Sequence, residues 1–270
     1  MILDEIIKVK RREVDCLKES TSLEALKKAV RDLPPPRNFR KAISDPECSI
    51  IAEVKRTSPS KGRIREDFDP LKIASIYEAN GAAAISVLTD KEFFEGGNSY
   101  LSQIKEAVSL PLLRKEFIID PYQIYETRII GGDAVLLIAS LLEEKTLRQF
   151  INLAESIGLS PLVEIHSREE LDKALAAGAE IIGINNRNLE TFSTDLRTSM
   201  ELVSSIPENK IMISESGVST REDIEALMQK GIHTFLVGEA LIKAPDIGKK
   251  LMKLLGGEIR NDRNKDLRND

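Results

Sequence analysis

The hydrophobic pattern of the chain changes near residue 49, from helical periodicity to short apolar runs that repeat. Before this point, apolar residues recur on one helix face with charged residues between them: Ile2, Leu3, Ile6, Ile7, Val14 and Leu17. Thr21 and Glu24 have capping-box spacing, which predicts that a second helix begins there and runs towards Leu33. Three prolines at 34–36 end it and form a stiff connector. Residues 1–46 are therefore predicted to be a helical extension.

From residue 49 onward, a short apolar run is followed each time by an amphipathic segment. Most of the runs lack strict alternation, as expected for parallel strands that are covered on both faces. They span residues 50–55, 82–88, 111–115, 134–138, 161–165, 180–184, 211–214 and 234–237. Helical periodicity marks the segments between them, for example 70–80, 143–157, 167–177 and 220–230. Several of these segments end at a glycine suited to cap a helix: Gly81, Gly131, Gly158, Gly178 and Gly231.

Eight such units in a row predict an α/β fold, a (β/α)8 TIM barrel over residues 47–257 with the N-terminal helical extension in front of it. A doubly wound sheet is the alternative. The uninterrupted repeat and the lack of a glycine-rich dinucleotide turn favour closure of the barrel. Residues 258–270 are almost wholly charged or amide-bearing, and we expect this tail to be disordered.

Composition excludes several classes of protein. The chain of 270 residues is 41% hydrophobic and 31% charged, which is typical of a soluble globular protein. A net charge of -5 provides no global positive field for nucleic acid, and no apolar stretch reaches membrane-spanning length. Two cysteines and two histidines argue against a disulfide scaffold and against a metal centre built from these residues. The start lacks the pattern of a secretory signal, so we expect a cytoplasmic protein.

Ionisable and polar residues recur at the carboxyl ends of the predicted strands. Glu53 and Lys55 lie two residues apart, so their side chains share one face of a strand that is otherwise apolar. Uncompensated buried charge is expensive, and packing therefore does not explain them. The other strand ends carry Ser86, Lys115, Glu164, Asn185 with Arg187, Glu215 with Ser216, and Gly238.

Any one of these residues by itself is more often a solvated or ion-paired structural residue. The carboxyl ends of all barrel strands converge on one mouth, however, so the recurrence predicts a single acid–base site. His166 and His233 lie outside this series and are expected to be surface or loop residues. Phe93, Phe94 and Phe117, near strand ends, suit either the core or the walls of a site for a planar ligand.

Two glycine-containing turns after the last two predicted strands indicate a phosphate site. Ser216 and Gly217 lie in the first turn, and Gly238 and Glu239 in the second. Backbone N–H groups in such turns, and the start of a short helix, attract phosphate oxygens in many barrels. Taken alone, each of these sequences is typical of an ordinary turn that binds no phosphate. The carboxylate of Glu239 would have to point away from a phosphate, leaving its N–H to donate.

The motifs at the strand ends resemble the indole-3-glycerol-phosphate synthase family. The resemblance is carried, in order and spacing, by EVKRTSPSKG (53–62), ISVLTD (85–90), LRKEFIIDPYQ (113–123), GINNRNL (183–189) and SESGV (214–218). It runs from the helical extension to about Leu255. There are two departures: Glu116 stands where an aspartate is usual, and Glu239 replaces a serine found in some members.

The resemblance implies a lyase of tryptophan biosynthesis that uses no cofactor and no metal. Its reaction would be ring closure of 1-(2-carboxyphenylamino)-1-deoxyribulose 5-phosphate to indole-3-glycerol phosphate, with release of carbon dioxide and water. Lys115 would be the general acid at the carbonyl, helped by Glu53 and Asn185. Glu164 and Lys55 would serve the dehydration, with their division of roles left open.

The remaining site residues implied by the resemblance bind the two ends of this substrate. Arg187 and Ser58 would hold the benzoate carboxylate, and the ring would pack against Phe94, Phe117, Leu136 and Leu189. Ser216, Gly217, Gly238 and Glu239 would contact phosphate, with Glu215 beside them, and Ser216 also belongs to the catalytic set. The helical extension would lie over the mouth and exclude water.

The expected partner is a small anionic molecule, with no nucleic acid and no membrane. A monomer is expected, and association with other enzymes of the pathway is left open. Two rival functions fit the same barrel: a Schiff-base aldolase or sugar-phosphate isomerase, and a non-catalytic phosphate-binding subunit. A Schiff-base lysine needs a depressed pKa, whereas neighbouring carboxylates favour the ammonium. Binding alone would need fewer acids than the strand ends carry.

Overall fold

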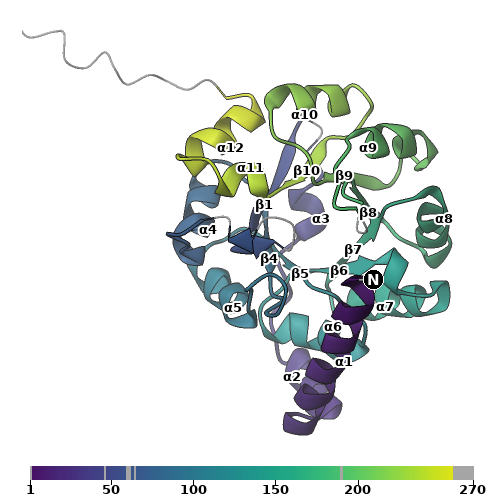
Figure 1. The fold of residues 1–270 in the computed structure, drawn as a ribbon. Coiled ribbons are helices and arrows are strands. Elements are labelled where there is room, and N and C mark those ends of the chain that lie inside the picture. The colour runs from purple at the N-terminus through teal and green to yellow at the C-terminus, as the bar shows by residue number, and fades with distance from the viewer. Residues whose placement is uncertain (1, 46, 59–61, 64, 189–190, 258–270) are drawn as a thin grey trace, which may run out of the picture.

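The computed structural model describes residues 2–45, 47–58, 62–63, 65–188 and 191–257, and their strands form a closed parallel barrel (Figure 1). The barrel strands are β1 (Ser49–Val54), β4 (Ala84–Leu88), β5 (Leu112–Lys115), β6 (Ala134–Ile138), β7 (Ser160–Ile165), β8 (Ile181–Asn185), β9 (Ile211–Glu215) and β10 (Thr234–Val237). Each strand pairs in parallel with the next, and β1 pairs with β10 to close the ring. The predicted (β/α)8 barrel is confirmed. A short antiparallel pair, β2 (Thr57–Ser58) and β3 (Gly62–Arg63), follows β1.

Helices surround the ring of strands (Figure 1). They are α4 (Pro70–Ala79), α5 (Asn98–Ala107), α6 (Pro121–Ile129), α7 (Glu144–Ser156), α8 (Arg168–Ala177), α9 (Arg197–Leu202), α10 (Arg221–Met228), α11 (Glu239–Ile242) and α12 (Ile247–Leu255), with 3-10 turns η1 (Ala139–Leu141) and η2 (Val203–Ser205). Side chains of Asp69, Asp120, Ser167, Thr220 and Asp246 accept hydrogen bonds from the first turns of their helices. The five glycines predicted to end helices all adopt positive φ.

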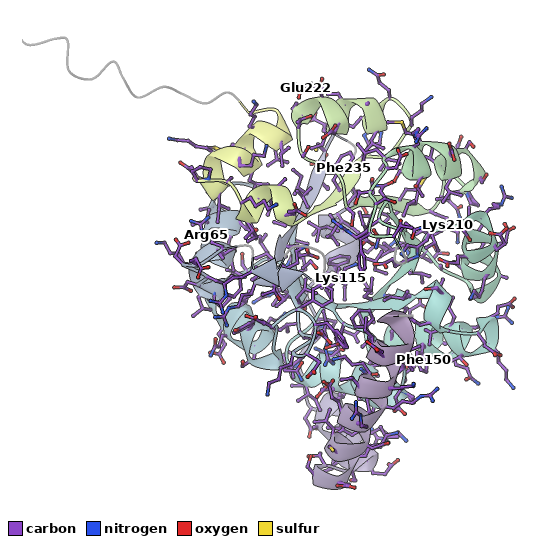
Figure 2. All side chains as sticks on the ribbon, viewed as in Figure 1. Arg65, Lys115, Phe150, Lys210, Glu222 and Phe235 are labelled. Atoms are coloured by element: carbon purple, nitrogen blue, oxygen red, sulfur yellow. The ribbon has the colours of Figure 1, made fainter. Side chains whose placement is uncertain are left out.

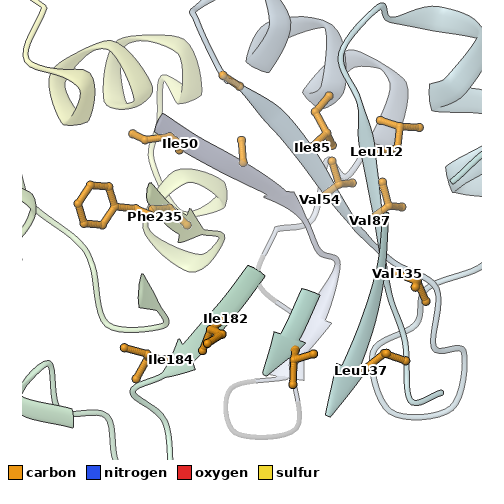
Figure 3. Close-up of a cluster of buried hydrophobic side chains, with 14 of the residues drawn as sticks. Ile50, Val54, Ile85, Val87, Leu112, Val135, Leu137, Ile182, Ile184 and Phe235 are labelled. Atoms are coloured by element: carbon orange, nitrogen blue, oxygen red, sulfur yellow. The ribbon is translucent and has the colours of Figure 1, made fainter. Parts of the chain in front are cut away.

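Two apolar layers follow from the alternation of side chains along the strands. Outward-facing residues such as Ile50, Val87 and Phe235 pack against the helices (Figure 3). Inward-facing residues fill the barrel interior, among them Leu113, Leu162 and Ile213. The next inward position on each of these three strands, two residues on, is occupied by Lys115, Glu164 and Glu215. The apolar interior thus forms the floor beneath a polar layer at the carboxyl ends.

The extension contains three helices rather than the two predicted. Helices α1 (Ile2–Ser20) and α2 (Leu23–Arg31) pack beside α6 (Figure 1). The predicted capping residue of α2 is wrong by one position, because Ser22 and not Thr21 accepts the hydrogen bond from Ala25 N. The backbone N–H of Thr21 still donates to Leu17 O, so Thr21 completes the end of α1.

The third helix, α3 (Phe39–Ala42), closes the amino end of the barrel. Phe39 and Ile43 are fully buried in the same cluster as the inward-facing strand residues. The hydroxyl of Thr234, the first residue of β10, donates to Ile43 O at 2.9 Å. The extension therefore contributes one helix to each end of the barrel, since α1 reaches the opposite rim.

Candidate active site

A cavity of about 500 Å³ opens at the carboxyl ends of the barrel strands. Lys115 lies near the middle of the ring in Figure 2. The cavity is lined by all but two of the predicted site residues: Glu53, Lys55, Phe94, Lys115, Phe117, Leu136, Glu164, Asn185, Arg187, Glu215, Ser216, Gly217, Gly238 and Glu239. Leu189 lies outside the described residues. Ser58 is described by its backbone, which belongs to β2.

The ammonium of Lys115 is held between two carboxylates. Its Nζ donates to Glu164 Oε2 and to Glu215 Oε2, each at 2.6 Å. Burial lowers the pKa of Lys115, but the charges of Glu164, Glu215 and, third, Glu53 outweigh burial and raise it overall. The side chain is therefore a charged ammonium that donates one N–H to each of two carboxylates.

The two carboxylates around Lys115 differ in their other partners. Glu164 Oε1 accepts from Asn185 Nδ2 at 3.1 Å and lies 3.4 Å from His166 Nε2. Against the opposing effect of burial, Lys115 and His166 lower the pKa of Glu164. Glu215 is equally buried, but its Oε1 has no hydrogen-bond partner among the described residues. Burial, with the nearby charge of Glu164, raises the pKa of Glu215 to about 7. A proton added to the pair therefore goes to Glu215.

Glu53 makes its hydrogen bond to Lys55 and acts on Lys115 through its charge. Lys55 Nζ donates to Glu53 Oε1 at 2.5 Å. The backbone carbonyl of Glu53 accepts from the buried hydroxyl of Tyr77 at 3.0 Å. The expected support of Lys115 by Glu53 is thus electrostatic, and the hydrogen-bonded pairs are Lys55–Glu53 and Lys115–Glu164/Glu215.

Two glycines make room for these carboxylates inside the barrel. A Cβ on Gly183 would overlap Glu215 Oε1, and a Cβ on Gly238 would overlap Glu53 Oε1. Neither glycine has a positive φ, so the requirement is for space and not for backbone conformation. The role of Gly238 in the structure is therefore to accommodate Glu53, in addition to any contact with phosphate.

Aromatic side chains form one side of the cavity. The rings of Phe94 and Phe117 lie 6.2 Å apart between centroids, at 38° to each other. Leu136 lines the cavity beside them, and Ile6 of α1 also reaches it. Phe94 and Phe117 both line the cavity, and Phe117 also packs against the cluster of inward-facing core residues.

The opposite part of the cavity contains the two glycine turns. Ser216 and Gly217 both have positive φ, 63° and 87°. The buried amide of Asn186 holds this turn, because its Nδ2 donates to the carbonyls of Glu215 and Ser216, each at 3.0 Å. Glu239, at the start of α11, accepts from Lys243 at 2.7 Å and lies 3.6 Å from Arg187 Nη2. Its carboxylate therefore faces these two cations.

The sequence did not indicate several residues of the site, among them His166, Asn186 and Lys243. His166 was expected to be a surface or loop residue. It does follow β7 directly, but its side chain is largely buried against Glu164. The signal was its position two residues after Glu164, on the same face. Lys243 is four residues after Glu239, which is helical contact spacing. The role of Asn186 depends on loop geometry that no spacing reveals.

Two properties of the described part of the chain bear on metal ions and membranes. Its His, Cys, Asp and Glu side chains include no group of three or more arranged to hold a metal ion. None of its helices combines the length and apolar character that crossing a bilayer requires.

Comparison with known proteins identifies the family. A family model described as indole-3-glycerol phosphate synthase matches residues 3–254. A relative of that name from Alkaliphilus metalliredigens is 48% identical over 258 residues, covering 95% of this chain and 99% of the relative. Another, from Thermoanaerobacter pseudethanolicus, is 49% identical over 246 residues, covering 91% and 94%.

Solved structures of other enzymes share the barrel. The 3-hexulose-6-phosphate synthase from Salmonella typhimurium aligns with a TM-score of 0.63 at 13% identity, covering 77% of this chain and 97% of that one. At this identity, the likeness shows the fold alone. The family match, which spans nearly the whole chain, carries the assignment: the chain belongs to the indole-3-glycerol phosphate synthase family.

Proposed function

We propose that Lys115 is the general acid that starts ring closure of 1-(2-carboxyphenylamino)-1-deoxyribulose 5-phosphate in this cavity. As a member of its family, the chain is a decarboxylating lyase of tryptophan biosynthesis that forms indole-3-glycerol phosphate. The observation that carries the role of Lys115 is its ammonium, hydrogen bonded to Glu164 and Glu215 at 2.6 Å each in the centre of the cavity.

The reaction divides into steps that need acids and bases but no redox partner. The ring carbon that bears the carboxylate attacks the ketone carbon, and Lys115 gives its proton to the ketone oxygen. The anilino nitrogen becomes an iminium, which accepts the electron pair of the breaking bond as carbon dioxide leaves. Loss of the new hydroxyl as water then needs an acid at that oxygen and a base that removes a proton from the ring. Lys55 and Glu164 supply these two functions.

The charge state of Lys115 favours proton donation over Schiff-base chemistry. A lysine that forms a Schiff base needs a depressed pKa. The carboxylates around Lys115 outweigh its burial and raise its pKa instead. Borohydride reduction in the presence of substrate separates the two chemistries, because a covalent adduct on Lys55 or Lys115 would support the aldolase.

Both parts of the cavity suit this substrate. Phe94 and Phe117 offer apolar surface to the aromatic ring from one side, and Arg187, which lies 3.6 Å from Glu239 on the other side, offers a guanidinium to the ring carboxylate. Ser216 and Gly217, with positive φ, present the turn at which the phosphate would bind through backbone N–H groups. A subunit that only bound phosphate would not need the acid–base set around Lys115.

We further propose residues 47–257 as the catalytic unit and residues 1–46 as the extension that covers its mouth. A monomer in the cytoplasm, without cofactor, stays a prediction. Size-exclusion chromatography with light scattering would measure the oligomeric state.

The activity is tested by mixing the purified chain with the carboxyphenylamino-ribulose phosphate and following indole absorbance and fluorescence. Lys115→Ala should lower turnover by at least about a hundredfold, the scale of a lost general acid. Lys145→Ala, which removes an exposed lysine on α7, is the matched control and should leave turnover unchanged. No indole from the wild-type chain would refute the function, and near-normal turnover of Lys115→Ala would refute the role of Lys115.

A further inference from the structure

A lysine from the extension is buried among carboxylates at the rim of the barrel. Lys10 lies on α1, and its side chain is only 2% exposed. Its Nζ lies 2.7 Å from Asp90 Oδ2, 3.1 Å from Glu116 Oε1 and 2.7 Å from Glu13 Oε2. Asp90 follows β4 and Glu116 follows β5, so one ammonium joins α1 to two neighbouring strand ends.

Each of the two rim carboxylates also holds the backbone of an aromatic wall residue. Asp90 Oδ1 accepts from the backbone N–H of Phe93 at 2.7 Å and of Phe94 at 3.0 Å. Glu116 Oε1 accepts from the N–H of Phe117 at 2.9 Å. Asp90 therefore holds the backbone of Phe94, and Glu116 holds that of Phe117. Lys10 contacts both carboxylates.

Further hydrogen bonds tie these carboxylates to the barrel. Glu116 Oε2 accepts from the hydroxyl of Thr89 at 2.7 Å, and Arg114 Nε donates to the same hydroxyl at 3.2 Å. Arg114 itself is paired with Glu126 at 2.7 Å. Among the described cations, Lys10 is thus the one that bridges Asp90 and Glu116.

Charge neutralisation explains why this arrangement needs an ammonium. Asp90 and Glu116 are both almost fully buried, and two buried carboxylates that share no cation repel each other. Burial lowers the pKa of Lys10, but Glu116 and Asp90 outweigh burial and raise it overall. Lys10 is therefore charged when it lies between them.

We propose that Lys10 is a positioning residue that sets the spacing of the Phe94–Phe117 walls and thereby the affinity for the aromatic end of the substrate. Lys10 does not line the described cavity, whereas Ile6, one helical turn earlier, does. Lys10 therefore acts on the ligand through Asp90 and Glu116. The inference rests on the proposed function for the identity of the aromatic ligand.

The test compares Lys10→Met with Lys18→Met. Lys18 lies on the same helix and also pairs with the barrel, 2.6 Å from Asp120, but it is 40% exposed and outside the cavity lining. Calorimetry measures the affinity for 2-aminobenzoate, as the aromatic fragment, and for inorganic phosphate. Loss of one aromatic contact predicts a three- to tenfold weaker affinity of Lys10→Met for 2-aminobenzoate, with phosphate affinity within about twofold of wild type. Lys18→Met should match wild type for both ligands.

Steady-state kinetics and a double variant complete the test. The KM of Lys10→Met for the full substrate should rise by a similar factor, with kcat within about threefold. Adding Glu116→Gln removes one of the two repelling charges, so Lys10→Met/Glu116→Gln should regain part of the affinity for 2-aminobenzoate. If Lys10→Met does not fold, this double variant is compared directly with Glu116→Gln alone and should still bind the fragment more weakly.

Three results would overturn the inference, two of them in the variant and one in the wild type. Unchanged affinity for 2-aminobenzoate in folded Lys10→Met would show that Lys10 does not position the aromatic walls. If the affinity for phosphate fell by the same factor as that for 2-aminobenzoate, Lys10 would contribute only to general stability. The fragment measurements do not depend on turnover, so a wild-type chain that binds 2-aminobenzoate but forms no indole would refute the proposed function alone. A wild-type chain that forms indole but does not bind the fragment would refute the inference alone.

Discussion

The carboxylate of Glu215 occupies the space that a side chain at Gly183 would fill. A Cβ added to Gly183 would overlap Glu215 Oε1 and would also lie 3.2 Å from Leu162 Cδ1. Both residues face the barrel interior from neighbouring strands, β8 and β9. The site therefore depends on the absence of a side chain at one interior position.

Replacing Gly183 by alanine should displace Glu215 and disturb its hydrogen bond to Lys115. We expect a loss of about 1–3 kcal/mol in the free energy of unfolding, typical of overpacking, together with at least about a tenfold loss in kcat. Denaturant unfolding and the indole assay measure the two effects. Gly97→Ala is the control, because an added Cβ there would be 3.6 Å from Ser99 Oγ, an ordinary contact. Wild-type turnover in Gly183→Ala would show that Glu215 can move without cost.

Glu215→Gln should change how stability depends on pH. The folded pKa of Glu215 is raised to about 7 from the ordinary 4.5, so the folded state binds a proton more tightly than the unfolded state. This stabilisation is present at low pH and is lost as pH rises from about 4.5 through 7, by on the order of 3 kcal/mol at most. The variant lacks it, so its Tm relative to wild type should increase between pH 5 and pH 8.

Thermal unfolding at several pH values measures this difference. Glu208→Gln, a change at an exposed loop position, is the control. Its Tm relative to wild type should not increase between pH 5 and pH 8. A Tm difference for Glu215→Gln that is equal at pH 5 and pH 8 would contradict the raised pKa.

His166→Gln should depend on pH in the same direction as Glu215→Gln, because the folded pKa of His166 is also raised. Burial lowers the pKa of His166, but Glu170 and Glu164 outweigh it and raise the folded value above the ordinary 6.5. The protonated imidazole therefore stabilises the fold fully below about 6.5, and this contribution is lost as pH rises through the folded pKa. The wild type should exceed the variant by on the order of 1 kcal/mol at pH 6 and by less at pH 9. His233→Gln, whose imidazole lies outside the cavity lining, is the matched control. A stability difference that grows with pH would be inconsistent with this sign.

Phe39→Ala tests the helix that closes the amino end of the barrel. Phe39 is fully buried, and truncating a buried phenylalanine leaves a cavity that costs about 3–5 kcal/mol. Turnover per folded molecule should stay within about threefold of wild type, because the acid–base set lies at the opposite end. Denaturant unfolding with active-site titration separates the two quantities. Leu71→Ala, at a position 37% exposed, should cost far less. A loss of turnover without a loss of stability would contradict this prediction, because it would show that α3 contributes to catalysis.

The strands and the polar residues at their carboxyl ends could be predicted from the sequence because side chains alternate between the two faces of every barrel strand. Residues two apart share a face, so Leu113 with Lys115 and Leu162 with Glu164 reveal the apolar floor and the polar layer above it. The convergence of all strand ends then follows from closure of the repeat. The boundaries shifted slightly, as at β4, which begins at Ala84 because Ala82 N still bonds to Tyr77 O at the end of α4.

Which carboxylate pairs with which lysine in the site could not be predicted in the same way. Glu53, Glu164 and Glu215 are alike in sequence position, and which of them reaches Lys115 depends on strand register and side-chain direction. The cap of α2 and the short helix α3 were also misjudged, because local spacing does not show where one helix ends or which cluster Phe39 joins.

The sequence by itself determined the repeat, the barrel and the set of ionisable residues at its mouth, because side-chain alternation and strand order are properties of the chain. The tertiary structure alone decided how that set is paired. It placed Lys115 between Glu164 and Glu215, gave Glu53 to Lys55, and brought Lys10 from the first helix to Asp90 and Glu116. These pairings join residues up to 106 positions apart, as between Lys10 and Glu116, and they depend on distances that only the folded chain defines.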